Sequence, residues 1–148
     1  MSHSALQLTT LDLYESDETA WLEQTARLLV EGRFGEIDTN QLSEFLLAMA
    51  IRDKREVLSR LIVLLAHLLK WEYQPTLRSS SWQATIAHQK YELFDLLESG
   101  TLRRHAEETL GLAYKRAIRE ASIETGLPDE TFPAVCPFTI ESLIAINE

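Results

Sequence analysis

VLSRLIVLLAHLLKWEY, residues 57–73, is apolar on nearly every side when it is placed on a helix of 3.6 residues per turn. The apolar face centres on Val57, Leu61, Leu64, Leu65 and Leu68. The polar residues in and around the stretch form one narrow stripe, made of Glu56, Arg60, His67, Lys70 and Gln74. Because a helix that is apolar almost all round is buried by other elements, this stretch is predicted to be the central helix of a bundle.

Start and stop signals outline further helices on both sides of this stretch. The first predicted helix is 17–31, with Ser16 as N-cap and Gly32 past the end, and a second helical stretch runs from Asp38 to Pro75, with Gln41 as capping-box partner. A third helix, 81–98, is capped by Ser80 and stopped by Gly100, and a fourth, 102–125, is capped by Thr101 and stopped by Gly126 and Pro128. Thr139 caps a short last helix through 146. Residues 127–138 contain three prolines and are expected to be irregular.

The sequence therefore predicts an all-α fold, a helical bundle of four to five main helices plus a short C-terminal helix. We expect residues 1–14 to be a loosely ordered N-terminal arm and residues 15–148 to form a single domain. Each further main helix has an apolar face at helical spacing. In helix 17–31 the face is Trp21, Leu22, Thr25, Leu28 and Leu29, and in the first half of the long stretch it is Leu42, Phe45, Leu46 and Met49. In helix 81–98 it is Trp82, Ile86, Leu93 and Leu97, and in helix 102–125 it is Ala106, Leu110, Ala113, Tyr114, Ala117 and Ala121.

The long stretch before Pro75 changes the phase of its apolar face. The face rotates by about 100° between Met49 and Val57 at the helical period. One interpretation is a kink or break between Ala48 and Lys54, and the other is that the two halves pack against different neighbours. We favour the break, with the first half against the first helix and the second half as the central rod.

The charge balance limits the kinds of partner. The chain carries 23 acidic and 14 basic residues, a formal net charge of −9. This charge opposes binding to nucleic-acid phosphates and anionic lipids, so nucleic acid is disfavoured as a partner. The longest apolar run, 61–66, is far too short to span a membrane. One cysteine, Cys136, fits a reducing compartment, and we expect a cytoplasmic protein.

No catalytic motif is recognisable in the chain. Glycine-rich phosphate loops, nucleophile elbows and paired-cysteine metal motifs are absent, and no histidine has a second histidine four residues away. Glu44 is the carboxylate nearest the buried face in the first half of the long stretch, but a carboxylate-bridged metal site needs several such residues. We therefore expect no metal and no cofactor. Trp71 and Trp82 flank the Pro75 loop, and both are predicted to be mostly buried there.

One segment is too particular to be generic. It contains His67, Lys70, Trp71, Tyr73, Gln74 and Pro75, followed by Arg78, Ser79 and Trp82. Together with LYE at 13–15, Trp21, LLA at 64–66, ETGLP at 124–128, and the Phe132-Pro133 and Cys136-Pro137 pairs, it resembles the bacterial domain-of-unknown-function family numbered twenty-nine. The resemblance implies an all-helical bundle and supplies no activity or ligand.

The chain departs from the family pattern in the first half of the long stretch. Glu44 matches, but Phe45 and Leu47 stand where glutamates are expected, and Ala50 stands where a glycine is expected. If those glutamates form a site in relatives, part of that site is lost here. The candidate residues are accordingly His67, Lys70, Trp71, Tyr73, Gln74, Pro75, Arg78, Ser79, Trp82 and Glu44.

Two functions of different classes compete. The first is a non-enzymatic interaction or regulatory protein that binds a protein partner or itself, and the lack of a catalytic motif favours it. The second is an enzyme or small-ligand binder with a pocket around His67, Lys70, Tyr73 and Arg78. An exposed apolar patch would indicate the first function, and a concave pocket at the motif would indicate the second.

Overall fold

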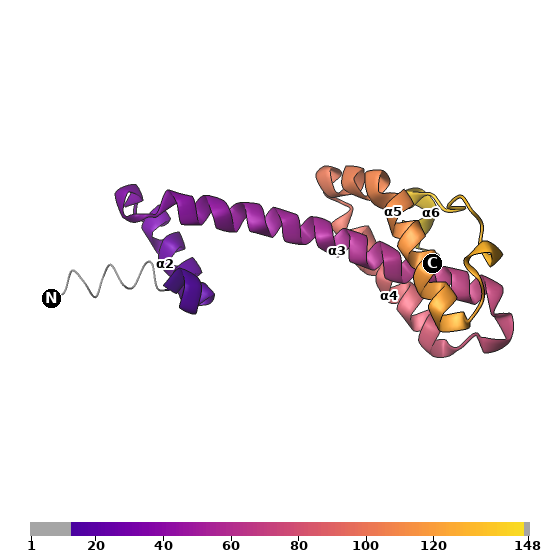
Figure 1. The fold of residues 1–148 in the computed structure, drawn as a ribbon. Coiled ribbons are helices and arrows are strands. Elements are labelled where there is room, and N and C mark those ends of the chain that lie inside the picture. Colours follow the sequence, from indigo (N-terminus) through magenta and orange to yellow (C-terminus); the bar gives the residue numbers. More distant parts are fainter. Residues whose placement is uncertain (1–12, 147–148) are drawn as a thin grey trace. The chain divides into compact units, whose positions relative to one another are not determined.

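The computed structural model describes residues 13–146, and all regular structure in that range is helical (Figure 1). In chain order the elements are α2 (Glu18–Val30), η1 (Phe34–Glu36), α3 (Thr39–Tyr73), η2 (Pro75–Leu77), α4 (Ser80–Leu96), α5 (Gly100–Thr125), η3 (Asp129–Thr131) and α6 (Ile140–Ile144). The predicted all-α fold, with four main helices and a short C-terminal helix, is confirmed. Of the predicted N-terminal arm, residues 1–12 lie outside the described residues, and Leu13 and Tyr14 are helical.

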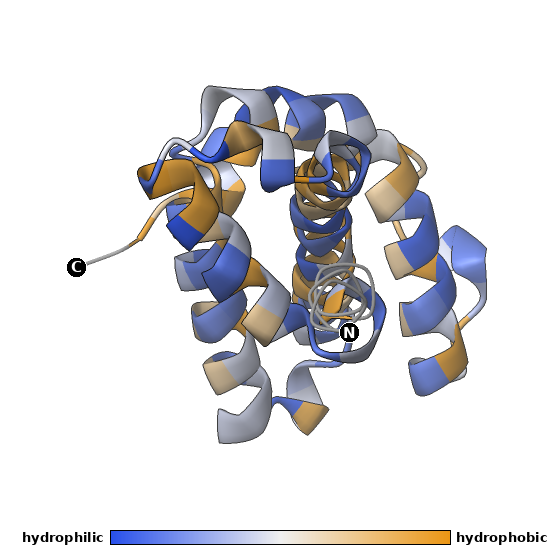
Figure 2. Cartoon of the chain, turned by 90° about the vertical axis from the view of Figure 1, so that its left-hand side faces the viewer, coloured by the Kyte–Doolittle hydropathy of each residue, from blue (hydrophilic) through white to orange (hydrophobic). Residues whose placement is uncertain are grey.

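The chain divides into two compact units, with the border between Ala50 and Ile51, inside α3. We call them the N-terminal unit and the C-terminal unit. Each helix carries hydrophobic and hydrophilic residues along its length (Figure 2), as expected for helices that bury one face. The expectation that residues 15–148 form a single domain remains a prediction.

The N-terminal unit is built around Trp21. Its ring lies edge-on to Tyr14, with centroids 4.7 Å apart, and tilted against Phe45 of α3 at 5.3 Å. The N-cap of α2 is Asp17, whose carboxylate accepts from the amide of Ala20 at 3.1 Å, so the prediction of Ser16 was one residue early. At the start of α3, Asp38 accepts from the amides of Asn40 and Gln41, as predicted for a cap.

The break predicted between Ala48 and Lys54 is wrong, because α3 is one helix from Thr39 to Tyr73. Arginine, lysine, glutamate and alanine dominate residues 50–56, and all four have high helix propensity, so nothing in the local sequence interrupts the helix. The competing interpretation accounts for the phase change. Phe45 in the first half contacts Trp21, whereas Val57 and Leu61 in the second half belong to the core of the C-terminal unit.

The core of the C-terminal unit surrounds the second half of α3. Val57, Leu61, Leu64 and Leu65 are fully buried, as predicted. Side chains from α4, α5 and the C-terminal segment complete this core: Leu93, Leu97, Ala106, Ala113, Tyr114, Ala117, Ala121, Phe132, Ile140 and Leu143. The alanines of α5 let that helix approach closely, because small side chains leave room for a neighbouring helix.

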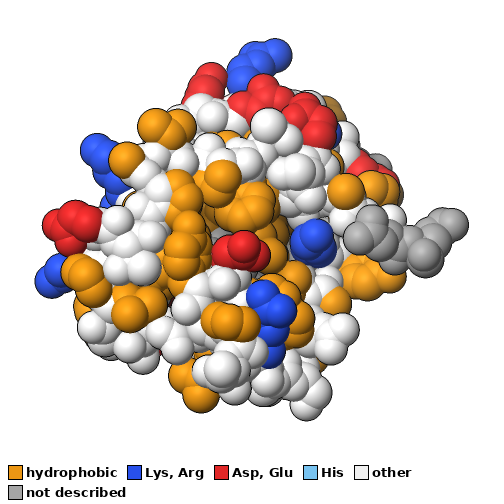
Figure 3. All heavy atoms as spheres, turned by 90° about the vertical axis from the view of Figure 1, so that its right-hand side faces the viewer, with side chains coloured by type: hydrophobic (Ala, Val, Ile, Leu, Met, Phe, Trp, Pro, Cys, Tyr) orange, Lys and Arg blue, Asp and Glu red, His pale blue; other side chains and the backbone are white. Residues whose placement is uncertain are grey.

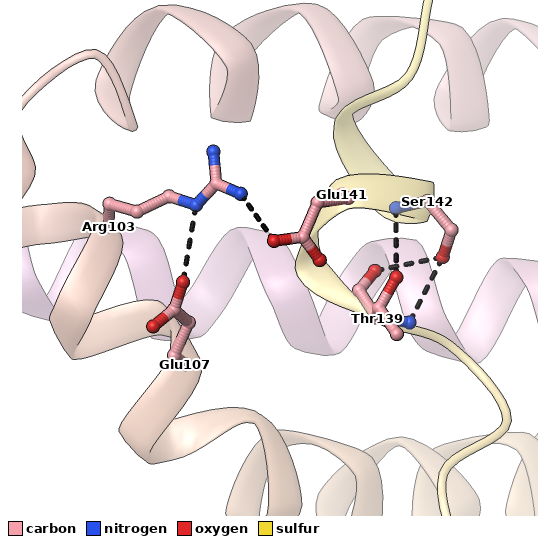
Figure 4. A network of polar contacts seen from close by, with 5 residues as sticks. All are labelled: Arg103, Glu107, Thr139, Glu141 and Ser142. Atoms are coloured by element: carbon pink, nitrogen blue, oxygen red, sulfur yellow. Dashed lines mark hydrogen bonds and ion pairs between the residues drawn. The ribbon is translucent and has the colours of Figure 1, made fainter.

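The helix ends in this unit are set by hydroxyl caps. Ser79 caps α4 and Ser99 caps α5, so the predicted caps Ser80 and Thr101 are corrected by one and two residues. Gly100, predicted as a stop, is the first residue of α5. Thr139 caps α6 as predicted, in a reciprocal capping box with Ser142 (Figure 4). Arg103 of α5 holds α6 through an ion pair with Glu141 at 2.8 Å and also contacts Glu107.

Candidate functional site

Lys70 is the most buried charged residue of the motif segment, with 6% of its surface exposed. Its Nζ lies 2.6 Å from a carboxylate oxygen of Glu124 on α5 and 5.1 Å from the centroid of the Trp82 ring. A buried ammonium needs such compensation, because leaving a charge unpaired away from water is costly. Lys70 therefore joins the end of α3 to both α5 and the start of α4.

Arg78 closes the turn between α3 and α4. Its Nε donates to the backbone carbonyl of Trp71 at 2.7 Å, and its guanidinium lies 4.9 Å from the centroid of the Trp71 ring. That carbonyl is in the last turn of α3, where carbonyls have no partner within the helix. Pro75 begins η2, and the Ser79 hydroxyl accepts from the amide of Trp82 to start α4. These motif residues hold the connection together.

Trp71 and Trp82 are each partly buried, and each has a cation beside its ring. Both tryptophans are mostly buried, as predicted, with part of each side chain exposed. Leu93 of α4 and its C-cap residue Leu97 are buried as predicted, and Ile86 is partly exposed. An indole that lies at the surface next to a cation gains from the cation–π contact as well as from burial. The two rings therefore stabilise the turn from its surface.

Among the residues that the structure describes, His67 and Gln74 form hydrogen bonds only with backbone groups. Nδ1 of His67 lies 2.9 Å from the carbonyl oxygen of Val63, one turn earlier in α3. Because a carbonyl only accepts, Nδ1 must carry the proton in this contact. The backbone N–H of Gln74 donates to the backbone carbonyl of Lys70. The backbone carbonyl of Gln74 accepts from the backbone N–H of Leu77.

Trp71 and Tyr73 line a cavity of about 330 Å³ beside the proline-rich segment. Its walls are Leu68, Leu69, Trp71, Glu72, Tyr73, Pro133, Pro137 and Phe138. His67, Lys70 and Arg78, which we expected around a pocket with Tyr73, are not among the residues that line it. Glu44 lies in the N-terminal unit. Burial, followed by the charges of Glu44 and Glu18, raises the pKa of Tyr14.

Tyr114 and Cys136 are polar residues outside the predicted candidate set. Burial raises the pKa of Tyr114 to about 12, with further contributions from Cys136 and Tyr73. Its hydroxyl donates to the carbonyl of Pro133 at 2.6 Å. Burial also raises the pKa of the Cys136 thiol, which contacts the carbonyl of Phe138. A sequence signal for Tyr114 existed, since it lies on the predicted buried face of its helix.

Residues 13–50 of the N-terminal unit expose much apolar surface. Leu22 and Leu29, predicted on the buried face of the first helix, are exposed, and so is Leu46, predicted on the buried face of the next. Within residues 13–50, the exposed large apolar side chains are Leu22, Leu29, Val30, Phe34, Leu46 and Leu47. The unit's buried face in α2 is limited to Trp21, Thr25 and Leu28. The prediction that Leu22, Leu29 and Leu46 belong to buried faces was therefore wrong.

The same unit concentrates the negative charge of the chain. Between residues 13 and 50 the sequence has eight carboxylates and two arginines, a net charge of −6, whereas residues 51–148 have 14 carboxylates and 12 basic residues, a net charge of −2. Both arginines are in or near α2, at Arg27 and Arg33, and Arg33 is already paired with Glu31 and Glu36. The surface of this unit is therefore acidic and partly apolar.

Comparison with protein families places the chain in a known family. A family model described as "Domain of unknown function DUF29" matches residues 13–147. The chain belongs to the DUF29 family. Searches among curated proteins and among solved structures found no match. The DUF29 match spans both units and all the candidate residues.

The described part of this DUF29 protein holds neither a metal-binding cluster nor a membrane-spanning helix. Residues 13–146 contain no group of three or more histidine, cysteine, aspartate or glutamate side chains placed to hold a metal ion. Among the helices of the same residues, none combines the length and the apolar character that crossing a bilayer requires.

Proposed function

We propose that this protein is a non-enzymatic interaction module whose N-terminal unit binds a basic amphipathic helix of a partner protein. The observation that carries the proposal is the pairing of exposed apolar side chains with a net charge of −6 in residues 13–50. Exposed apolar surface of this kind marks interaction sites. A cytoplasmic setting, in which Cys136 remains a free thiol, is part of the proposal.

The spacing of the exposed side chains in α2 supports a helical partner. Leu22, Ala26 and Leu29 follow the i, i+4, i+7 pattern of one helix face, with Val30 next to it. This face differs from the one that carries Trp21, Thr25 and Leu28. An amphipathic helix recognises such a surface through its own apolar residues at the same spacing.

The first half of α3 contributes in the same way. Phe45 faces Trp21, while Leu46 and Leu47 are 58% and 63% exposed. A helix that is apolar on more than one side is stable in water only when a second neighbour covers the other side. The first half of α3 therefore has an exposed apolar side against which a partner can pack.

Charge selects the class of partner. Residues 13–50 of two copies would bring −6 against −6, which opposes self-association through this surface, and anionic lipids and nucleic acids are repelled for the same reason. A helix with leucines on one side and lysines or arginines around them complements both the apolar and the acidic side chains. Complementary charge also speeds association and makes it sensitive to salt.

The test uses the full chain and three synthetic peptides. One has leucines at helical spacing with lysines elsewhere, the second is its scrambled isomer without an apolar face, and the third replaces the lysines with glutamates. We expect the first peptide to bind at least about tenfold more tightly than the other two, with an affinity that falls as salt rises. Equal binding of the first peptide and its isomer would show only non-specific charge attraction and would overturn the proposal.

Matched surface variants locate the binding. Val30→Gln and Leu47→Gln change residues that are 89% and 63% exposed in the N-terminal unit, and their controls are Val135→Gln and Leu77→Gln, at 81% and 60% exposed in the C-terminal unit. The first pair should weaken peptide binding and the controls should not. Sedimentation of the chain without peptide shows whether a second copy of the chain occupies this surface instead. A dimer that Leu47→Gln dissociates, or a monomer that binds no peptide, would contradict the proposal.

A further inference from the structure

The cavity beside the end of α3 has walls of an unusual composition. It lies in the C-terminal unit, between residues 68–73 of α3 and the segment 133–138, and has a volume of about 330 Å³. That volume suits a small ligand or a single side chain. Figure 3 looks at this end of the unit, where hydrophobic side chains gather over the middle of the face with charged groups among them.

Three aromatic rings line the cavity, those of Trp71, Tyr73 and Phe138. All three are partly buried, so each has both support from the core and surface left for a ligand. Tyr73 is held edge-on against the buried Phe132, with centroids 5.2 Å apart. Arg78 holds Trp71 through the backbone carbonyl and the ring. The rings are therefore positioned before any ligand arrives, which lowers the entropy cost of binding.

Glu72 is the one charged residue that lines this cavity. Its side chain is exposed, which places the carboxylate at the rim, and no lysine or arginine among residues 13–146 forms an ion pair with it. The remaining walls are leucine and proline. The cavity thus combines an apolar aromatic lining with an unpaired negative charge at its edge.

This combination selects among ligand classes. An anion would be repelled by Glu72, and a metal ion needs several oxygen ligands where the cavity offers a single carboxylate side chain. A cation whose charge is covered by alkyl groups is weakly hydrated, and it gains from aromatic ring faces and from a nearby carboxylate together. We infer that the cavity binds an alkylated ammonium group, with its alkyl groups against Trp71, Tyr73 and Phe138 and its charge beside Glu72.

A contact already present in the molecule has the same chemistry. The guanidinium of Arg78 lies 4.9 Å from the centroid of the Trp71 ring. Arginine is the most weakly hydrated cationic side chain, and tryptophan is the aromatic residue with the strongest attraction for cations. Arg78 therefore already uses part of the Trp71 ring, and the inferred ligand would take the part that lines the cavity. This inference concerns the C-terminal unit and does not rest on the partner surface of the N-terminal unit.

The first experiment compares choline with 3,3-dimethylbutan-1-ol, which has the same shape without the charge. Binding to the full chain is followed by Trp71 side-chain NMR signals, assigned with Trp71→Phe. We expect saturable binding of choline with a Kd of about 1 mM or tighter, and at least about tenfold weaker binding of the neutral compound. Equal affinities would mean an apolar pocket without cation selectivity and would overturn the inference.

Variants at the rim test the role of the charge. Glu72→Gln removes the carboxylate without altering a buried contact, and Glu120→Gln, at an exposed position of α5, is the matched control. Glu72→Gln should weaken choline binding at least about fivefold, whereas Glu120→Gln should leave it unchanged. An unchanged affinity in Glu72→Gln would contradict the inference, and because the carboxylate is exposed this variant is expected to fold normally.

The same ammonium group occurs in different carriers. Free choline, a peptide that contains trimethyl-lysine, and phosphatidylcholine vesicles are therefore compared as separate probes. The carrier that binds most tightly, and that Glu72→Gln weakens, identifies the source of the group. Failure of all three to bind would overturn the inference while leaving the peptide test of the N-terminal unit unaffected.

Discussion

At the scale of single residues, Tyr114 links α5 to the proline-rich segment through the hydrogen bond to Pro133. In Tyr114→Phe the partly buried carbonyl of Pro133 loses its donor, so we expect the free energy of unfolding to fall by about 1–2 kcal/mol in urea denaturation. Tyr91→Phe, at a residue 56% exposed, is the control and should change it by less than about 0.5 kcal/mol. A Tyr114→Phe protein as stable as the control would show that the hydrogen bond contributes nothing.

The raised pKa of Tyr114 also predicts a response to alkaline pH. The unfolded chain loses this phenolic proton near pH 10, whereas the folded chain keeps it until pH about 12. Between these values the unfolded state binds fewer protons, so stability falls as the pH rises. Urea midpoints from pH 9 to pH 12 should decline less steeply in Tyr114→Phe than in the unmodified chain. Equal slopes in the two proteins would contradict the attribution of this loss of stability to Tyr114.

Lys70 and Glu124 provide a second test at this scale. Glu124→Gln leaves the buried ammonium without its counter-charge, and we expect a loss of about 1–2 kcal/mol, less than for a fully buried pair because Glu124 reaches solvent. Adding Lys70→Met should recover most of that loss in urea denaturation. The exposed pair of Arg33 and Glu36 is the matched control, and Glu36→Gln should have a smaller effect. Equal effects would mean that burial of Lys70 is unimportant.

At the scale of elements, the unbroken α3 has a direct test at Ala50. Ala50→Gly should lower the stability by about 1 kcal/mol, and Ala50→Pro by about 3 kcal/mol or more, because both act on a helix interior. NMR Cα shifts of residues 48–54 in the unmodified chain should be helical throughout. Coil-like shifts there, with a harmless Ala50→Pro, would restore the break predicted from the phase of the apolar face.

Whole elements were predictable because the signals that specify them are local. Asp38, Gly126 and Thr139 mark helix ends through their own hydrogen bonds or backbone angles, and all three were recognised. Two of the missed helix starts lie in runs of serine, threonine and glycine, where neighbouring hydroxyls compete for the same role, and at the third Ser16 and Asp17 are both good N-caps. At residues 79–81 and 99–101 the choice depends on how the chain enters the helix, which packing decides.

At the scale of the whole molecule, the two units should differ in their ability to fold alone. The buried apolar cluster runs from Val57 to Leu143 and lies entirely in the C-terminal unit. We expect a fragment of residues 51–148 to unfold cooperatively on heating, and a fragment of residues 13–50 to show no cooperative transition, since it is below the size that sustains a core. Loss of cooperativity in the larger fragment would show that the units fold only together.

The sequence by itself determined the helical class, the central helix, the buried face of α5 and the concentration of charge in residues 13–50, because periodicity, capping and charge are properties of neighbouring residues. Only the tertiary structure decided that Lys70 meets Glu124, 54 positions later, and that Trp71 and Tyr73 share a cavity with Pro137 and Phe138. It also decided that Leu22 and Leu46 remain exposed. An apolar face specifies that burial is favourable, but the neighbour that covers it comes from distant parts of the chain or from another molecule.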